Sequence, residues 1–582
     1  MADEILIFEK ADRIGKVASV DTSKVLIDAE DQNLVTKIGI GNLVAILGST
    51  ESEYLIGLVE RVTRTLRDEL IDDGGDEVEV VEIGPSPSDL LRVVLIGTYR
   101  TVQGDKKNVF KRGADSFPQI DRECLLIQGG NLQRLMGLLA SGLQEHEKLQ
   151  LGHFAIDPDA VAIASGDKFF QRHASILGST GSGKSWAVAL LLEKASQLKY
   201  PNILVLDMHG EYTPLTEEGG FAKGFKIAGP GDLDSDDENI IRLPYWLLNR
   251  DEMLSMILDR SDQNAPNQAS RFTLHVRNLK EKTLDDNGKG DVKETFTVDS
   301  PIPYQLEDLV SLLKKDDTDK GVSPTTGKPV KGDWEGKLTR FVSRLEAKLE
   351  DRRYGFMFKP TDGTNEYDWL ADLASKLIGS DAENKGIKII DFSEVPSDVL
   401  PVVTGTFARL LYDLQFWLDP EKRSPFALVC DEAHIYLPVK NDANAVEKQA
   451  LATFERIAKE GRKYGVSLVV VSQRPSDVSR TILSQCNNFL VLRLTNDADQ
   501  NVVRKLMPDS MVGLTDMLPL LDTGEALLLG DAILLPTRIK LDKPALEPAS
   551  GTLNFWSDWS NQSSDIDAIK LAVETLRRQT RI

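Results

Sequence analysis

Short apolar runs alternating with polar residues fill the first part of the chain. Between Arg13 and about Ile127, β-branched and leucine-rich runs such as GKVASV, NLVAILG and LRVVLIG are separated by Gly, Asp, Asn and Ser. Their spacing of about 8–15 residues is typical of a small antiparallel barrel or sandwich. We therefore predict one small N-terminal β domain over residues 1–130.

The pattern changes after residue 130. Residues 131–151 have the apolar spacing of a helix and predict a connector over residues 131–168. From Phe169 onward, runs that are apolar on both faces alternate with helical segments: HASILG, NILVLD, IKIID, FALVCDEA, SLVVVSQ and FLVLRL. Such alternation indicates a mainly parallel sheet covered on both faces. We predict this α/β core over residues 169–545.

Two further segments have helical patterns. From about residue 241 to 377, amphipathic helices surround two polar stretches, Lys280–Lys293 and Lys314–Gly332, which predicts an inserted helical subdomain with two flexible loops. Residues 546–582 predict a helical tail that packs on its own domain or on a neighbouring subunit. One helical face of this tail would carry Ile566, Ile569, Val573 and Leu576.

The amino-acid composition limits which binding partners and which cellular compartment fit the protein. The 582 residues include 69 Lys and Arg against 91 Asp and Glu, a formal charge of −22. This charge excludes binding of nucleic acid through overall basicity, so a polyanionic partner must meet a locally basic surface. Three scattered cysteines and six histidines support neither a disulfide framework nor a zinc site. Without a signal-like start or a long apolar run, we expect a cytoplasmic protein that does not bind membranes.

The strongest chemical signal is the sequence GSTGSGKS at residues 178–185, directly after one apolar run and directly before another. Its glycines let backbone N–H groups converge on phosphate oxygens, and the following helix start adds a favourable dipole. Lys184 would reach the β- and γ-phosphates and Ser185 would ligate Mg²⁺, so the expected cofactors are ATP and Mg²⁺. A glycine-rich turn without a ligand is the alternative. The predicted nucleotide-binding residues are Gly178, Ser179, Thr180, Gly181, Ser182, Gly183, Lys184, Ser185 and Trp186.

A second strand end supplies acidic side chains. The apolar run FALVC ends in Asp431 and Glu432. Asp431 would hold Mg²⁺, largely through water, and Glu432 would polarise the attacking water. Alone, this pattern also fits a strand end with surface acids, and its combination with the phosphate loop favours hydrolysis. The string DEAH at residues 431–434 suggests a DEAH-box helicase, but it lies too far from Lys184 for that family and the other helicase motifs are missing.

Two more strand ends would complete the site. Gln473 follows the run SLVVVS, and its amide is a candidate sensor of the γ-phosphate. Asp207 ends the run ILVLD and would help to bind the metal or water. His209 and Glu211 follow Asp207 closely, and a capped loop is the alternative to a catalytic role for them.

Together these motifs resemble the HerA family of the HerA/FtsK ATPases. The segments RHASILGSTGSGKS, LVLDMHGEY, LVCDEAH, RKYGVSLVVVSQRP and TGEALLLGDAILLPTRI follow the family's order, and the similarity runs from about Gly15 to Ile539. The resemblance implies an α/β P-loop core of the RecA/FtsK type behind a small β-barrel. It also implies a homohexameric ring that threads double-stranded DNA through its pore and moves along it using ATP.

The resemblance carries site roles onto matching residues. Arg172, twelve residues before Lys184, matches a position where the family has an arginine. Arg462 matches the arginine finger expected to act in trans, with Arg456 close by as an alternative. An arginine from a neighbouring subunit stabilises charge that develops on the transferred phosphoryl group. The catalytic set that the resemblance implies is Lys184, Asp431, Glu432, Gln473, Arg172 and Arg462, with Ser185 and Asp431 as ligands of Mg²⁺. The strand end at Asp207 adds a third candidate ligand.

The implied partner is a NurA-like nuclease in DNA end processing or another effector in anti-phage defence. A second hypothesis is a nucleotide-regulated ring scaffold that assembles and activates an effector enzyme without translocation. A third is a small-molecule kinase or signalling GTPase. Guanine specificity has no support, because the NKxD motif is missing and residues 384–387 read Asn-Lys-Gly-Ile.

Overall fold

The computed structural model forms two compact units, each described here by itself. The first contains residues 1–198, 469–476 and 483–545, and the second contains residues 199–468, 477–482 and 546–582. The structure describes residues 5–578 except 22–23, 31–34, 37, 49–52, 71–82, 103–106, 115, 234, 236, 323–324, 326–327, 360, 362, 380–384, 442, 552–554 and 562–564.

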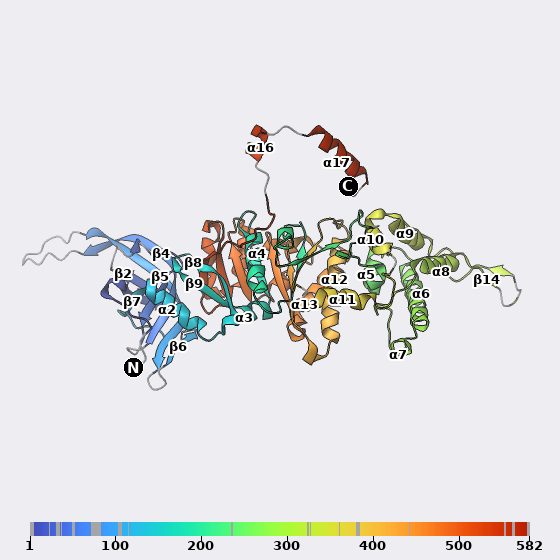
Figure 1. Ribbon diagram of the computed structural model, residues 1–582. Coiled ribbons are helices and arrows are strands. Elements are labelled where there is room, and N and C mark those ends of the chain that lie inside the picture. Colours follow the sequence, from blue (N-terminus) through green and yellow to red (C-terminus); the bar gives the residue numbers. More distant parts are fainter. Residues whose placement is uncertain are drawn as a thin grey trace, which may run out of the picture. The chain divides into compact units, whose positions relative to one another are not determined.

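The first unit begins with a closed antiparallel β-barrel (Figure 1). Its six strands follow the order β2-β1-β7-β3-β4-β5, and pairing of β2 with β5 closes the ring. Alternate residues such as Val25, Ile27, Val44 and Ile46 are fully buried inside it, which confirms the predicted barrel. A further strand, β6, extends from β5. The bounds are β1 (Arg13–Asp21), β2 (Lys24–Ala29), β3 (Leu43–Leu47), β4 (Glu53–Leu70), β5 (Ile83–Val102), β6 (Lys107–Arg112) and β7 (Glu123–Ile127).

The segment predicted as a connector contains both helix and strand. Helix α2 (Gly129–Ala140) follows the helical apolar spacing, with Leu132 and Leu135 buried. Strands β8 (Lys148–Phe154) and β9 (Asp157–Ser165) then form a hairpin that pairs with β21 (Thr537–Leu541), and Leu149 and Leu151 are buried two residues apart, as expected for a strand. Helix α3 (Gly166–Gln171) ends the segment.

The remaining strands of the first unit form one part of the predicted α/β core. Strand β10 (Ala174–Leu177) pairs in parallel with β18 (Val466–Ser472), whose last residues belong to this unit, and with β19 (Asn488–Leu492). From β19 the pairing is antiparallel through β20 (Glu525–Gly530) and β21 to β8 and β9. The helices are α4 (Lys184–Ser196), α15 (Asp497–Leu506) and the 3-10 helix η10 (Asp509–Leu520).

The second unit contains a parallel sheet in the order β13-β12-β16-β11-β17. All five residues of β11 and of β17 are buried, as expected for strands covered on both faces. These parallel strands confirm the predicted α/β class. The bounds are β11 (Ile203–Asp207), β12 (Lys223–Ile227), β13 (Ile240–Ile241), β16 (Ile387–Asp391), β17 (Phe426–Cys430), α12 (Leu400–Trp417), α13 (Ala445–Glu460) and α14 (Arg480–Leu483).

Helices fill the region where the sequence predicts an insertion. The predicted flexible loop at Lys280–Lys293 is wrong, because α6 continues to Asp286 and α7 follows it. Lys280 is buried and donates hydrogen bonds to the carbonyls of Val298 and Ser300, so a polar residue here supports packing. The bounds are α5 (Arg250–Ile257), α6 (Ala265–Asp286), α7 (Gly290–Lys293), α8 (Leu306–Thr318), α9 (Thr339–Glu350), α10 (Gly355–Phe358) and α11 (Trp369–Ile378).

The second predicted loop, Lys314–Gly332, begins within α8 and contains the short hairpin of β14 (Gly321–Val322) and β15 (Pro329–Val330). Residues 323–324 and 326–327 of that prediction lie outside the described residues. The tail forms α16 (Phe555–Asn561) and α17 (Ile566–Arg578), and α17 confirms the predicted helix. No described helix combines the length and apolar character that a membrane span requires.

The fold buries all three cysteines, and none of them forms a disulfide bond. Burial raises the pKa of Cys124 and of Cys486 to about 12. Because the thiolate is the nucleophile, a thiol with such a pKa is ionised to about one part in ten thousand at pH 8. We therefore expect iodoacetamide at pH 8 to leave both cysteines unmodified in the folded protein while it labels the urea-unfolded chain. Peptide mass spectrometry measures this, and rapid labelling of either residue in the folded protein would contradict it.

Candidate active site

The GSTGSGKS segment joins strand β10 to helix α4 in the first unit. The loop ends at Gly183, the N-cap of α4, with φ of 101°. This left-handed conformation is one that residues with a side chain rarely adopt. The first helical turn leaves backbone N–H groups without intrahelical acceptors, and Lys184, which begins the helix, is only 8% exposed. The buried Ser182 hydroxyl has no hydrogen-bond partner among the described residues. These donors fit a phosphate group.

Gln473 lies beside this loop, as its predicted role requires. Leu177 of β10 and Ser472 of β18 are register partners, so Gly178 and Gln473 leave adjacent strands at the same level. The Thr180 hydroxyl donates a hydrogen bond of 2.6 Å to Oε1 of Gln473. Since the amide oxygen is used in this way, the amide N–H groups of Gln473 are the part available to a phosphate oxygen.

Residues far along the chain brace the phosphate loop, and the sequence motifs did not identify their role. The N–H of Ser179 donates to the carbonyl of Arg493 at 2.8 Å, and the N–H of Gly524 donates to the carbonyl of Ser182 at 3.1 Å. The Thr495 N–H donates to the Ser179 hydroxyl at 3.3 Å. Gly524 lies in the TGEALLLG segment, and this segment is the one feature of the sequence that could have pointed to the contact with the phosphate loop.

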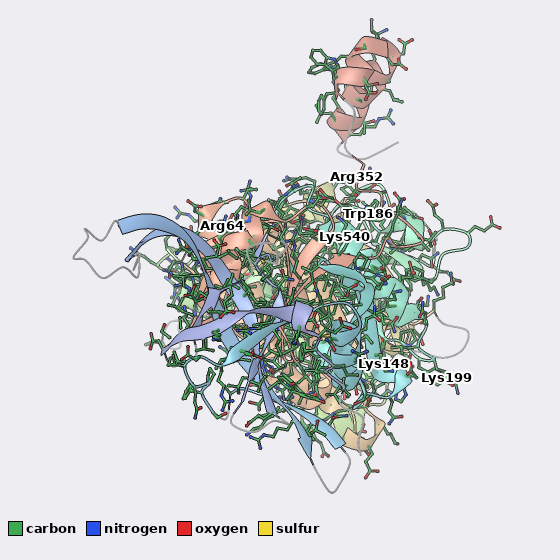
Figure 2. All side chains as sticks on the ribbon, turned by 90° about the vertical axis from the view of Figure 1, so that its left-hand side faces the viewer. Arg64, Lys148, Trp186, Lys199, Arg352 and Lys540 are labelled. Carbon is green, nitrogen blue, oxygen red and sulfur yellow. The ribbon has the colours of Figure 1, made fainter. Side chains whose placement is uncertain are left out.

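Trp186, the last of the predicted nucleotide-binding residues, lies in the first turn of α4. Figure 2 labels its side chain. The Nζ atom of Lys543 is 5.1 Å from the centre of its ring. This contact ties the start of α4 to the chain that leaves β21.

The predicted hydrolytic carboxylates lie at a strand end of the second unit. Asp431 and Glu432 follow β17 and are 3% and 8% exposed. Glu432 has φ of 43° and ψ of 45°, a left-handed conformation that costs a residue with a side chain about 1–2 kcal/mol. Oε2 of Glu432 is 3.3 Å from Nδ1 of His434. Strain of this kind is typical of functional positions, where the surrounding structure holds a side chain in place.

Asp207 ends β11, beside β17, since Leu206 and Cys430 are register partners. Its Oδ1 atom accepts hydrogen bonds from the N–H groups of His209, Gly210 and Glu211, and its Oδ2 atom accepts one from Tyr212. Burial raises its pKa to about 6. These bonds support the capped loop as the role of the segment that holds His209 and Glu211, and the metal role of Asp207 stays a prediction.

Arg172 lies away from the phosphate loop of its own chain. It precedes β10, whereas the loop follows it, and a strand of four residues spans about 13 Å. The guanidinium pairs with Asp531 instead. Any action of Arg172 on a nucleotide therefore requires a second copy of the chain.

Arg462 and Arg456 have different surroundings. Arg456 on α13 lies 4.9 Å above the Tyr412 ring and pairs with Glu460 at 3.7 Å and with Asp413 at 3.9 Å. Arg462 lies in the 3-10 helix η8 (Gly461–Tyr464), where it is exposed. Its guanidinium makes no hydrogen bond or ion pair with the part of the chain that the structure describes. Arg462 is therefore the arginine that can reach another subunit without breaking existing contacts.

Among the described residues, no group of three or more His, Cys, Asp or Glu side chains is arranged to hold a metal ion. Mg²⁺ in nucleotide sites is usually bound by one or two protein groups, water and the phosphates themselves. The hydroxyl of Ser185 and the carboxylate of Asp431 are donors of the required kind. Strand, phosphate loop and helix in this order define a P-loop ATPase.

Comparison with known proteins finds relatives in the HerA family. Residues 149–411 match the family model described as "Helicase HerA, central domain". A probable helicase of Methanocaldococcus jannaschii is 26% identical over 81% of this chain and 80% of its own length. The DNA double-strand break repair helicase HerA of Sulfolobus acidocaldarius is 27% identical over 68% of this chain and 69% of its own length. These matches confirm the resemblance to the HerA family, and the chain is an ATP-hydrolysing enzyme whose residues 149–411 match the model of the HerA central domain.

Similar solved structures include VirB4 of Thermoanaerobacter pseudethanolicus and the bacterial conjugative coupling protein TrwB. Both are 16% identical with a TM-score of 0.44. The first covers 69% of this chain and 97% of its own, and the second covers 73% and 94%.

Proposed function

We propose that the protein is an ATP-driven translocase or helicase that acts on double-stranded DNA. The observation that carries this proposal is the phosphate loop, with Lys184 starting helix α4 and Thr180 bonded to Gln473. The relatives named as DNA double-strand break repair helicases support DNA as the substrate. The proposal requires that Asp431 and Glu432 converge with this loop on one nucleotide.

The proposed chemistry assigns one task to each side chain. Lys184 neutralises charge on the β- and γ-phosphates, and Mg²⁺, when bound, would neutralise the same oxygens from the side of Ser185 and Asp431. Glu432 orients the attacking water and accepts its proton. Gln473 donates a hydrogen bond to the γ-phosphate and so distinguishes ATP from ADP.

The proposed assembly is a homohexamer in which each site is completed by its neighbour. Its support is the location of the arginines: Arg462 is exposed, and Arg172 precedes β10 whereas the phosphate loop follows it. The arginine finger that acts in trans is assigned to Arg462, and Arg172 is proposed as a second arginine that acts on the nucleotide of the neighbouring subunit. Because the chain carries a net charge of −22, the pore that holds DNA must be locally basic. A NurA-like nuclease or a defence effector is the proposed protein partner.

The test is ATP hydrolysis by the purified chain with and without DNA. We expect turnover to rise several-fold with linear double-stranded DNA and to rise less at higher salt, because salt weakens phosphate contacts. Light scattering reports the oligomer in the same samples, and the Lys184→Ala chain gives the background. A hexamer whose turnover is indifferent to DNA would contradict the proposal.

A further inference from the structure

Asp531 binds Arg172 in the first unit. It follows β20, and its Oδ2 atom accepts hydrogen bonds from Nη1 of Arg172 and, at 3.2 Å, from Nδ2 of Asn487. Although partial burial opposes it, these bonds hold the pKa of Asp531 below its ordinary value. The carboxylate is therefore ionised at neutral pH and forms a charge-assisted pair with the guanidinium.

The same carboxylate also contacts the β-barrel. Nη1 of Arg112, the last residue of β6, is 3.6 Å from Oδ1 of Asp531 and donates to the Gly530 carbonyl at 3.4 Å. Gly530 has φ of 119°, and a Cβ there would lie 2.1 Å from the Asn487 carbonyl oxygen. Only glycine therefore lets the chain turn at this point and bring Asp531 between the two arginines.

The loop that carries Asp531 is fixed by its backbone. The Asp531 N–H donates to the Asn487 carbonyl at 3.3 Å, and the Asn487 N–H donates to the Arg172 carbonyl at 3.1 Å. The next residue, Ala532, donates to Oδ1 of Asn488 at 2.8 Å and accepts from the Ser165 N–H at 2.8 Å. Asp531 is thus held in a defined position relative to the start of β10.

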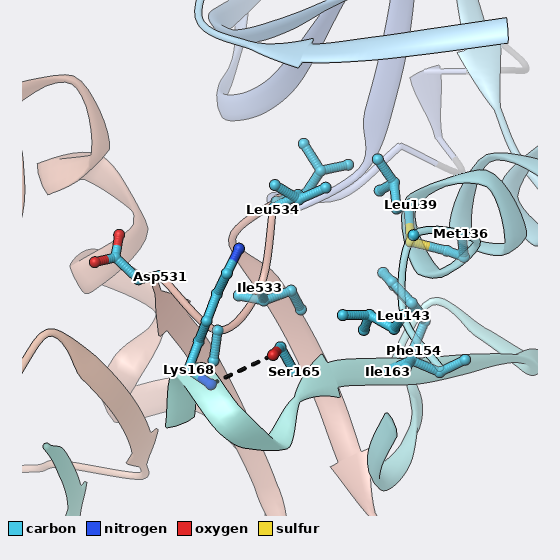
Figure 3. Close-up of a pocket in the computed structure, with 13 residues that line it drawn as sticks. Met136, Leu139, Leu143, Phe154, Ile163, Ser165, Lys168, Asp531, Ile533 and Leu534 are labelled. Atoms are coloured by element: carbon cyan, nitrogen blue, oxygen red, sulfur yellow. Dashed lines mark hydrogen bonds between the residues drawn. The ribbon is translucent and has the colours of Figure 1, made fainter. Parts of the chain in front are cut away.

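Apolar contacts support the same loop from another side. Ile533 and Leu534 line a cavity of about 190 Å³ together with Met136, Leu139 and Leu143, and Figure 3 shows Asp531 in the same loop. Met136 and Leu139 belong to α2, which follows the barrel in the chain. The loop that carries Asp531 therefore packs against the helix that follows the barrel in the chain.

We infer that Asp531 positions Arg172 for action on the nucleotide of a neighbouring copy, and that Arg112 links this arginine to the β-barrel. The inference rests on the proposed function, in which subunits complete one another's sites. About a third of each of the side chains of Arg172 and Asp531 is exposed, so another copy can approach them. Asp531 is a positioning residue, since it acts through the guanidinium that it holds.

The first test separates positioning from folding. We expect Asp531→Ala to lower kcat for ATP between about 10- and 100-fold, because a displacement of about 1 Å in a catalytic group has effects of that size. The KM for ATP should stay within about threefold, since nucleotide binding depends on the phosphate loop. Asp531→Asn, which retains an oxygen acceptor, should lose less. Asp516→Ala is the matched control, because it removes the partner of Arg504 at 3.0 Å elsewhere in the unit.

A double variant and mixed oligomers complete the test. Arg172→Ala with Asp531→Ala should be no slower than Arg172→Ala alone, because both changes remove one function. Oligomers that mix Asp531→Ala with Glu432→Gln subunits should exceed the weighted average of the two parents, because each Glu432→Gln subunit supplies an intact Arg172 to its neighbour. Two different affinity tags confirm that the subunits mix.

Unchanged kcat in Asp531→Ala, an additive loss in the double variant, or a mixture that equals the weighted average would each overturn the inference. A failure of the proposed function gives a different result from a failure of this inference. In that case the unmodified chain shows no DNA-stimulated turnover, whereas failure of this inference leaves that activity intact.

Discussion

Glu432→Gln is expected to lower ATP turnover between about 100- and 10,000-fold, the range in which a positioned general base contributes to catalysis. The amide has the same shape as the carboxylate, so the left-handed backbone at this position is preserved. It cannot accept a proton from water, and the charge that orients the water is lost. Nucleotide affinity should change little, because the phosphate loop lies on a different segment of the chain.

Glu211→Gln is the matched control for this prediction. In the structure the backbone of Glu211 caps Asp207 and accepts a hydrogen bond from the Ala549 N–H at 2.7 Å. We therefore expect this variant to keep most of its turnover. Phosphate release measures kcat, and a fluorescent ATP analogue measures binding. If Glu432→Gln and Glu211→Gln lowered kcat equally, Glu432 could not be assigned as the general base.

The Glu432→Gln variant also distinguishes the translocase hypothesis from the hypothesis of a ring scaffold. A translocase that drives its effector by movement loses effector stimulation together with hydrolysis. A ring that only assembles its effector retains most of that stimulation, because ATP still binds. Measuring effector activity beside turnover therefore decides between the two functions.

The sequence predicts those parts of the molecule that local chemistry determines. The barrel follows from alternating apolar residues, and the strands of the core follow from runs that are apolar on both faces. The phosphate loop is also local, because Gly183, Lys184 and the helix that they begin are contiguous. Gln473 was found because it directly follows a buried strand, and the structure then places it against Thr180.

Features that depend on distant segments could not be predicted in the same way. The carbonyl of Arg493 and the N–H of Gly524 brace the phosphate loop through backbone atoms. Backbone hydrogen bonds do not require a particular side chain, so the sequence does not reveal them. Lys280 has the polarity of a loop residue, yet its ammonium group donates hydrogen bonds to two carbonyls inside a packed subdomain. The orientation of β10, which separates Arg172 from its own phosphate loop, follows from the parallel sheet.

Arg462→Ala is expected to lower kcat by at least about 1,000-fold, the lower end of the contribution that arginine fingers make to phosphoryl transfer. The guanidinium would act only as charge develops on the γ-phosphate, so the KM for ATP should change much less than kcat. The exposed position of Arg462 makes a folding defect an inadequate explanation of such a loss. Thermal unfolding of the variant should therefore match that of the unmodified chain.

Arg456→Ala is the matched comparison, because the two residues lie six positions apart. Arg456 already contacts the Tyr412 ring, Asp413 and Glu460, so its loss should lower stability by roughly 1 kcal/mol and leave kcat within about threefold. If Arg456→Ala abolished turnover and Arg462→Ala did not, the finger would be Arg456, which would have to leave the aromatic ring when a neighbouring nucleotide arrives. The ratio of the two kcat values, measured at saturating ATP and DNA, distinguishes these arrangements.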